Sequence, residues 1–400
     1  MAASSIATGT TSAPQGSPAP APSARGQRHI PALDGVRGVA ILLVFTYHAL
    51  RGLPVVRWHE ELINRAANAG WVGVDLFFVL SGFLITGILL EAKGGTRYFR
   101  SFYTRRVLRI FPLYFACVAL VIWLVPALHL ATPADAATLR SEQWWYWTYL
   151  VNVMVARHDW PSAVWNTGHL WSLSIEEQFY LLWPAVVLVL DDRALLRTAA
   201  ALVLGATLLR GALVIAHASA TAIYVLLPTR MDSLAAGAGL AVLARAPGAW
   251  AALRRWAPAA GTVAALALAA IIYREGMLYS ERRLTQLAGY PALVALAAVT
   301  IVSATSAPAG SVRAWFWSHP VLRFFGRYSY GLYVWHHLAI PLLRTYVLPD
   351  AALPAFHGSH LPGYALFYLL ALAVSLGVAL ASWHLLEHPF LSLKRFVPYQ

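Results

Sequence analysis

The sequence predicts an all-α integral membrane protein, a bundle of ten transmembrane helices. Of its 400 residues, 59% are hydrophobic and only 12% are charged, whereas about a quarter of the residues of a soluble domain are charged. The apolar residues gather in runs long enough to cross a bilayer about 30 Å thick. The net charge of +13 comes from Lys and Arg that flank these runs without forming a basic face, so we exclude nucleic acid as a partner.

The predicted organisation has three parts. Residues 1–28 are rich in Ala, Pro and Ser and have no apolar core, which predicts a disordered cytoplasmic tail and not a signal peptide. Residues 29–393 form the membrane domain, and residues 394–400 a short cytoplasmic tail. The predicted spans cover residues 36–53, 70–90, 107–128, 174–190, 195–216, 222–243, 257–273, 287–306, 325–343 and 363–384.

One aromatic segment is not counted among the spans. It runs from Trp144 to Ala156 and is about half as long as a spanning helix, so we expect an interfacial or re-entrant segment. Ten spans put both termini on one side. With cytoplasmic termini, 19 Lys and Arg lie on the inner side and nine in the outer loops, as the positive-inside rule favours. An eleventh span would put the clusters at Arg254 and Lys394 outside.

The first predicted span carries two ionisable residues, Arg37 and His48. Eleven residues of helix rise about 16 Å and complete about three turns plus 20°, so the two side chains line one face. Ionisable groups in a bilayer are costly and usually functional or shielded. A single His is equally often a hydrogen-bonded packing residue, and this helix alone does not decide between the two.

Two further motifs combine charge with apolar sequence. In "YFRSFYTRRVLRIFP", Arg105, Arg106 and Arg109 are helix neighbours that suit a ligand with several phosphates, although positive-inside anchoring explains them equally well. In "WNTGHLWSLSIEEQFYLLWP", Glu177 fits a capping box with Ser174. Glu176 has no such structural explanation.

These motifs together resemble the integral-membrane acyltransferase family 3, the ten-span O-acyltransferases. The segments are Arg37 to His48, "GVDLFFVLSGFLIT" from Gly73, "RRVLRIFP" from Arg105 and "HLWSLSIEEQFYLLWP" from His169. Weaker similarities are "TRMDSLAAG", "SYGLYVWH" and "EHPF". The resemblance covers residues 31–393.

The resemblance implies an enzyme of the cytoplasmic membrane that moves an acyl group, most often acetyl, from acyl-CoA to a hydroxyl of a glycan or lipid-linked saccharide. It makes His48 the catalytic histidine and Arg37 its partner. It also makes Glu176 a carboxylate near the acceptor, and it assigns the donor to Arg105, Arg106 and Arg109. Many relatives carry an additional hydrolase-like domain, and we expect transfer here without one.

A mechanism follows from these side chains. An alcohol needs a base to accept its proton, and a neutral His48 in an apolar environment suits that task. Asp75 and Glu176 are the candidates to orient its ring, with Glu176 favoured. Ser81 and Gly82 let helices separate or pack closely, and close packing is the stronger interpretation. Direct transfer and an acyl-His48 relay both remain open.

The other intramembrane polar residues are predicted to be structural. They are His336, His337, Arg230 and Asp232. Arg230 and Asp232 do not face each other at i and i+2, so each needs a partner elsewhere. Cys117 is expected to be a packing residue, and no metal site is expected.

Two alternatives compete with the glycan acyltransferase. The same motifs fit an acyltransferase of a small secreted metabolite such as a macrolide. A transporter or flippase also carries intramembrane charges, but transporters often show paired repeats with broken helices, and the sequence shows none.

We predict that a reporter fused after Gln400 is active in the cytoplasm, because the distribution of Lys and Arg favours inner termini. Paired phosphatase and fluorescent fusions measure the location. A C-terminal reporter that is active only outside the cytoplasm would contradict the ten-span topology.

Overall fold

The computed structural model describes residues 30–161, 165 and 167–398, and no β-strand occurs in this part of the chain. The predicted tail, residues 1–28, lies outside the described residues. The first helices are α1 Pro31–Leu50, α2 Trp58–Asn68, α3 Gly73–Ala92, α4 Tyr98–Ala119, α5 Val125–Ala127, α6 Pro133–Trp147, α7 Val151–His158, α8 Trp171–Val189 and α9 Asp192–Ile215. The remaining helices are α10 Ala220–Val225, α11 Leu227–Leu243, α12 Pro247–Glu275, α13 Tyr290–Thr305, α14 Val312–Trp317, α15 Pro320–Arg327, α16 Ser329–Leu342, α17 Leu361–Ser382 and α18 His388–Ser392.

Seven helical stretches in the described part of the chain are long and apolar enough to cross a membrane. They are Pro31–Leu50, Trp58–Ala92, Tyr98–Ala127, Asp192–Ile215, Pro247–Glu275, Thr285–Thr305 and Leu361–Phe396. Each contains or largely overlaps one predicted span. The all-helical membrane architecture is therefore confirmed, in a coarser form than the ten spans predicted.

The other three predicted spans correspond to shorter or more polar helices. Residues 174–190 fall within α8, which carries two glutamates in its first half. Residues 222–243 are divided between α10 and α11 at Leu226, which is extended. Pro228 lacks the N–H that would continue the helix from α10. Residues 325–343 are likewise divided between α15 and α16 at Tyr328.

The aromatic segment does not form one continuous helix. It is divided between the end of α6 and the start of α7, and the turn between them holds Tyr149 in a left-handed conformation with a φ of 54°. The Tyr149 ring stacks on Tyr114 of α4 with centroids 4.1 Å apart. This break fits a short interfacial or re-entrant segment.

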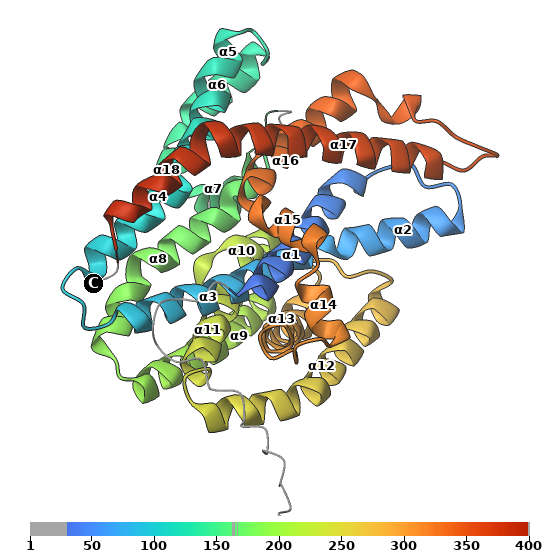
Figure 1. The fold of residues 1–400 in the computed structure, drawn as a ribbon. Helices are drawn as coiled ribbons and strands as arrows, with labels where there is room; N and C mark the ends of the chain where they lie inside the picture. The colour runs from blue at the N-terminus through green and yellow to red at the C-terminus, as the bar shows by residue number, and fades with distance from the viewer. Residues whose placement is uncertain (1–29, 162–164, 166, 399–400) are drawn as a thin grey trace, which may run out of the picture.

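Helix α1 lies at the centre of the bundle, between α3 and the α15–α16 segment (Figure 1). Its contact with α14 and α15 is a backbone contact. A Cβ on Gly38 would lie 2.0 Å from the Leu322 carbonyl oxygen, and one on Gly326 would lie 1.8 Å from the Asp34 carbonyl oxygen. Glycines therefore set the close approach that fixes α1 in place.

Helices α3 and α11 pack equally closely. A Cβ on Gly82 would lie 1.9 Å from the Leu234 carbonyl oxygen, and one on Gly237 would lie 1.9 Å from that of Val79. This contact agrees with the close-packing interpretation of Gly82. A backbone contact of this kind leaves no room for a side chain on either helix.

Two buried ion pairs lie beside this contact. Arg230 donates to Asp75 at 2.7 Å, and Arg210 pairs with Asp232 at 2.8 Å. All four side chains are at most 1% exposed. The prediction that Arg230 and Asp232 each need a partner elsewhere is confirmed. Removing one partner would leave an unpaired buried charge, which typically costs about 3 to 5 kcal/mol of stability.

We predict that Gly82→Ala lowers the free energy of unfolding by about 1 to 3 kcal/mol, because the new methyl group would collide with the α11 backbone. Thermal unfolding in detergent measures the change. Gly377→Ala in α17 is the control, since no atom lies within 4 Å of its Cβ position. Equal unfolding temperatures for the two variants would contradict the close packing of α3 and α11.

Candidate active site

A large cavity lies among α1, α3, α4, α8 and α16, beside the first half of α1. Its volume is about 1060 Å³, which is the size of a small-molecule site. Its charged lining consists of the cations Arg37, Arg106, Arg109, Arg245 and Lys394 and the carboxylates Asp34, Glu91 and Glu176. The excess of cations favours an anionic ligand.

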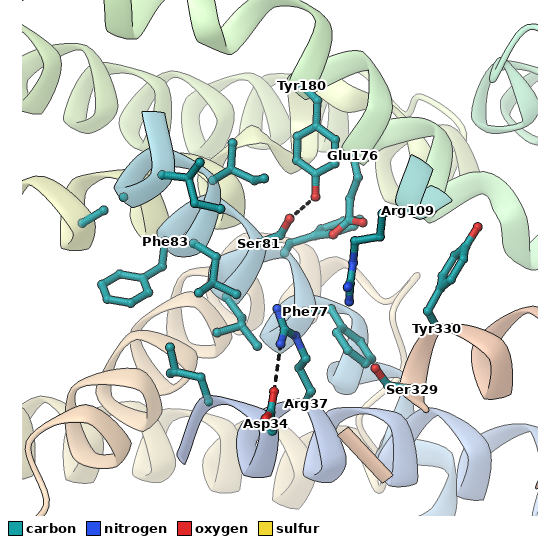
Figure 2. A pocket seen from close by; sticks show the side chains of 18 of the residues that line it. Asp34, Arg37, Phe77, Ser81, Phe83, Arg109, Glu176, Tyr180, Ser329 and Tyr330 are labelled. Atoms are coloured by element: carbon teal, nitrogen blue, oxygen red, sulfur yellow. Dashed lines mark hydrogen bonds and ion pairs between the residues drawn. The ribbon is translucent and has the colours of Figure 1, made fainter. Parts of the chain in front are cut away.

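Charged groups on three helices point into this cavity (Figure 2). Arg37 of α1 and Arg109 of α4 direct their guanidinium groups into the same space as the Glu176 carboxylate of α8. Arg37 is paired with Asp34 at 3.0 Å. The Arg106 guanidinium lies 5.8 Å from the centroid of the Tyr180 ring, and its Nε has no hydrogen-bond partner among the described residues.

Arg105 has a different position from the other two arginines of its cluster. Its Nη1 donates to the carbonyl oxygens of Lys394 at 3.1 Å and Val397 at 2.9 Å. The Ser101 hydroxyl donates to the Pro398 carbonyl oxygen at 2.9 Å. The segment 394–398 therefore packs against α4, and Lys394 lines the cavity.

Glu176 lies on α8 and lines the large cavity. It interacts with the hydroxyl groups of Ser81 and Tyr180, which hydrogen-bond to each other, and with the charges of Arg37 and Arg106. Helix α8 begins at Trp171, so Glu176 lies about 7.5 Å along its axis. No contact with His48 is formed within the described residues, in contrast to the expectation that Glu176 orients its ring.

The other carboxylates also differ from prediction. The capping box is wrong, because Ser174 lies inside α8 and its hydroxyl donates to the Leu170 carbonyl oxygen at 3.2 Å. The Glu177 Oε1 atom is buried with no hydrogen-bond partner in the described part of the chain. Asp75 is engaged by Arg230 and accepts from the Ser233 hydroxyl at 3.3 Å. It is therefore not the partner of His48.

A second cavity, of about 190 Å³, lies at the far end of α1. It is lined by His48, His337, Ile340, Pro341, Arg344 and Thr345. Arg37 and His48 thus open into different cavities, although both belong to α1.

Four histidine rings gather at this second cavity. The ring centroid of His48 lies 4.9 Å from that of His336 and 4.7 Å from that of His337, and the His169 ring stacks on His337 at 4.5 Å. Despite this cluster, no three His, Cys, Asp or Glu side chains of the described residues are arranged to hold a metal ion. Proton transfer and nucleophilic attack are the chemistry open to such a cluster.

Tyr333 separates the large cavity from the histidines. Its hydroxyl donates to the His169 carbonyl oxygen at 2.8 Å, so its oxygen accepts from the Ser172 hydroxyl at 2.5 Å. Tyr333 and Ser172 line the large cavity, and the Tyr333 ring lies 5.7 Å from that of His336. One aromatic side chain thus divides the cationic region from the imidazoles.

Several residues of this site have no role in the sequence prediction. Lys394 contributes there only to the topology count, and His336 is classed as structural. His169 lies inside a quoted motif without being singled out. The spacing of Tyr333, His336 and His337 in "SYGLYVWHH" was the available signal, since residues three and four apart share a helix face.

Residues 30–384 match the acyltransferase domain family. The chain belongs to this family. Arg37, His48, the three arginines of α4 and Glu176 all lie within the matched acyltransferase region, whereas Lys394 lies beyond it.

The chain is also similar to individual proteins of Bacillus subtilis and Listeria monocytogenes. It is 32% identical over 340 residues to a putative peptidoglycan O-acetyltransferase of Bacillus subtilis, covering 79% of this chain and 49% of the relative. It is 29% identical over 350 residues to a peptidoglycan O-acetyltransferase of Listeria monocytogenes, covering 79% and 50%. The chain thus spans about half the length of these curated relatives. No solved structure matches.

Proposed function

We propose that the chain is a membrane O-acyltransferase that moves an acyl group, acetyl first of all, from cytoplasmic acyl-CoA to a hydroxyl of a cell-envelope glycan. The observation that carries the proposal is the cationic cavity separated from a histidine cluster by Tyr333. Family membership and the names of the relatives support the reaction class, and those names favour peptidoglycan as the acceptor.

The donor side of the proposal rests on the charges of the large cavity. Acyl-CoA carries several phosphates, which Arg groups bind with two parallel hydrogen bonds and Lys binds as a point charge. We assign the phosphates to Arg106, Arg109 and Lys394, with Arg37 further in. Arg105 supports the donor site indirectly, because its bonds to the C-terminal carbonyls hold Lys394 at the cavity.

The acceptor side rests on His48 and the smaller cavity. We assign the acceptor hydroxyl to this cavity, on the outer side of the membrane. In direct transfer, His48 takes the hydroxyl proton while the hydroxyl oxygen attacks the thioester carbonyl carbon. The C–O bond forms, the C–S bond breaks, and the proton passes to the leaving thiolate.

A relay is the alternative route between the two cavities. A nitrogen of His48 attacks the thioester, the C–N bond forms as the C–S bond breaks, and the leaving thiolate takes the proton of the imidazole N–H. The acceptor hydroxyl oxygen then takes the acyl group, the C–N bond breaks, and the hydroxyl proton returns to the imidazole. Both routes require the thioester to pass Tyr333. We propose that the Tyr333 ring moves when the donor fills the large cavity, which would break its hydrogen bonds to Ser172 and to the His169 carbonyl oxygen.

The proposed topology has ten spans in the cytoplasmic membrane, with both termini in the cytoplasm. The count of Lys and Arg supports it, since the cations of the large cavity then face the compartment that makes acyl-CoA. Helices α8, α11 and α16 supply the three spans beyond the seven long apolar stretches.

Comparing a deletion strain with its parent tests the function directly. Mass spectrometry of envelope glycans and secreted metabolites identifies the acceptor and the acyl group together. We expect loss of O-acetyl groups from a glycan. An unchanged acylation pattern of every glycan, with a changed small metabolite, would redirect the proposal to that metabolite.

We predict that Arg109→Ala and Lys394→Ala each raise the KM for acetyl-CoA by about 10- to 100-fold, the loss expected for a charge-assisted hydrogen bond. Arg100→Ala is the matched control, because Arg100 lies on α4 but is exposed outside the cavity. Acetyl-pantetheine, which lacks the phosphates, should be used equally well by the wild-type protein and by all three variants. An unchanged KM for acetyl-CoA in both cavity variants would leave these cations with a topological role alone.

We predict that His48→Ala lowers acyl transfer by a factor of about 100 to 10,000, the usual cost of losing a general base. Acyl incorporation by membranes, normalised to protein level, measures the loss. The control is His384→Ala, an exposed histidine outside both cavities. If His48→Ala membranes kept more than about a tenth of the normal rate, His48 would be a packing residue.

A further inference from the structure

His48 makes a direct side-chain contact with His336, from the middle of α16. The His48 Nδ1 and His336 Nε2 atoms are 3.1 Å apart. His336 is fully buried, whereas His48 is partly exposed and lines the smaller cavity. The contact joins two imidazoles with no carboxylate between them.

The hydrogen bonds of His336 fix the position of its proton. Its Nδ1 lies 3.0 Å from the Leu332 carbonyl oxygen. A carbonyl oxygen can only accept, so this nitrogen carries the proton. A second proton on Nε2 would make a buried cation, and no carboxylate of the described residues pairs with His336 to stabilise it. The Nε2 atom of His336 is therefore an acceptor.

The same reasoning then applies to His48. Both neighbours of its Nδ1 are acceptors, namely His336 Nε2 at 3.1 Å and the Val44 carbonyl oxygen at 3.0 Å. Nδ1 must therefore carry the proton of a neutral His48. The lone pair lies on Nε2, which has no hydrogen-bond partner among the described residues.

We propose that His336 is a positioning residue that, together with the Val44 carbonyl oxygen, holds His48 in the tautomer with a free Nε2. This inference rests on the proposed function, because a free Nε2 is needed whether His48 acts as base or as acyl carrier. When Nε2 takes the acceptor proton, the Nδ1–H remains bonded to His336. The imidazole of His336 occupies the place that a carboxylate holds in the Ser-His-Asp arrangement.

The surroundings of His48 explain why an imidazole serves here. The titratable or charged groups that face it are Tyr47 on its own helix, Arg51 directly after that helix, Arg344 in the same cavity lining, and three histidines, His336 and His337 on α16 and His169 before α8. No carboxylate is among them. A neutral acceptor can orient His48 without the desolvation cost of burying a negative charge.

Two kinds of variant separate orientation from packing. His336→Gln keeps an oxygen that can accept from His48, whereas His336→Leu and His336→Met fill the space without an oxygen or nitrogen acceptor. We expect kcat to fall about 100-fold or more in the Leu and Met variants, with the KM for acetyl-CoA unchanged. The reason is that a wrong histidine tautomer lowers kcat by up to about 10,000-fold in the Ser-His-Asp case. Gln should recover kcat to within about tenfold of the normal value.

A labelling experiment reads the tautomer without acyl transfer. Diethyl pyrocarbonate acylates the unprotonated nitrogen of an exposed imidazole, and peptide mass spectrometry follows His48 in membranes. We expect the labelling rate of His48 to fall at least about threefold in Leu or Met but not in Gln. This readout stays valid if the wild-type protein transfers no acyl group, an outcome that would refute only the proposed function.

Two results would overturn the role of His336. One is a kcat in Leu or Met above about a third of normal. The other is that the Gln, Leu and Met variants, at normal protein levels, lose kcat and His48 labelling equally. Packing alone would then explain the role of His336. Leu and Met differ in shape, so a folding failure of one leaves the other to decide.

Discussion

Helix α1 fixes the distance between the cations of the large cavity and the histidines at the small one, and the rest of the site depends on that distance. Arg37 opens into the large cavity and His48 into the small one, about 16 Å apart along the axis. The glycine contacts with α14 and α15 leave α1 no room to slide. In the proposed reaction, a donor held by its phosphates in the large cavity would therefore reach the imidazoles by its own extension.

The membrane interior decides how each charge is accommodated. Arg210 and Arg230 lie where water does not reach, and each has a carboxylate within 2.8 Å. The cations of the large cavity have fewer partners, and the Arg106 Nε has none among the described residues. Charges that are costly to leave unpaired are common at ligand sites, because the ligand supplies the missing partner. Arg210 and Arg230 also have nitrogen atoms without a hydrogen bond, so their carboxylate partners are what distinguish them from Arg106 among the described residues.

Sequence periodicity predicted the long helices well and the polar contacts poorly. The apolar runs at α1, α3, α12 and α17 are continuous, so their length alone reveals them. A break such as that before Pro228 is hidden inside an apolar run. The family motifs named Arg37, His48 and Glu176, but they could not show that Tyr333 lies between the cavities or that His336 faces His48. Those contacts depend on helix rotation and tilt, which the sequence of one helix does not encode.

The attachment of the C-terminal segment has a consequence for how sequences of this kind can vary. Arg105 and Ser101 donate hydrogen bonds to the backbone carbonyl oxygens of residues 394, 397 and 398. The attachment therefore depends on where these carbonyls lie along the chain and not on which side chains the residues carry. Apart from Lys394, which lines the large cavity, we expect substitutions along the segment to leave these hydrogen bonds in place as long as the carbonyls stay in register. A single inserted or deleted residue in the helices before Lys394 would rotate its ammonium group by about 100°. Length, more than composition, is what this segment has to preserve.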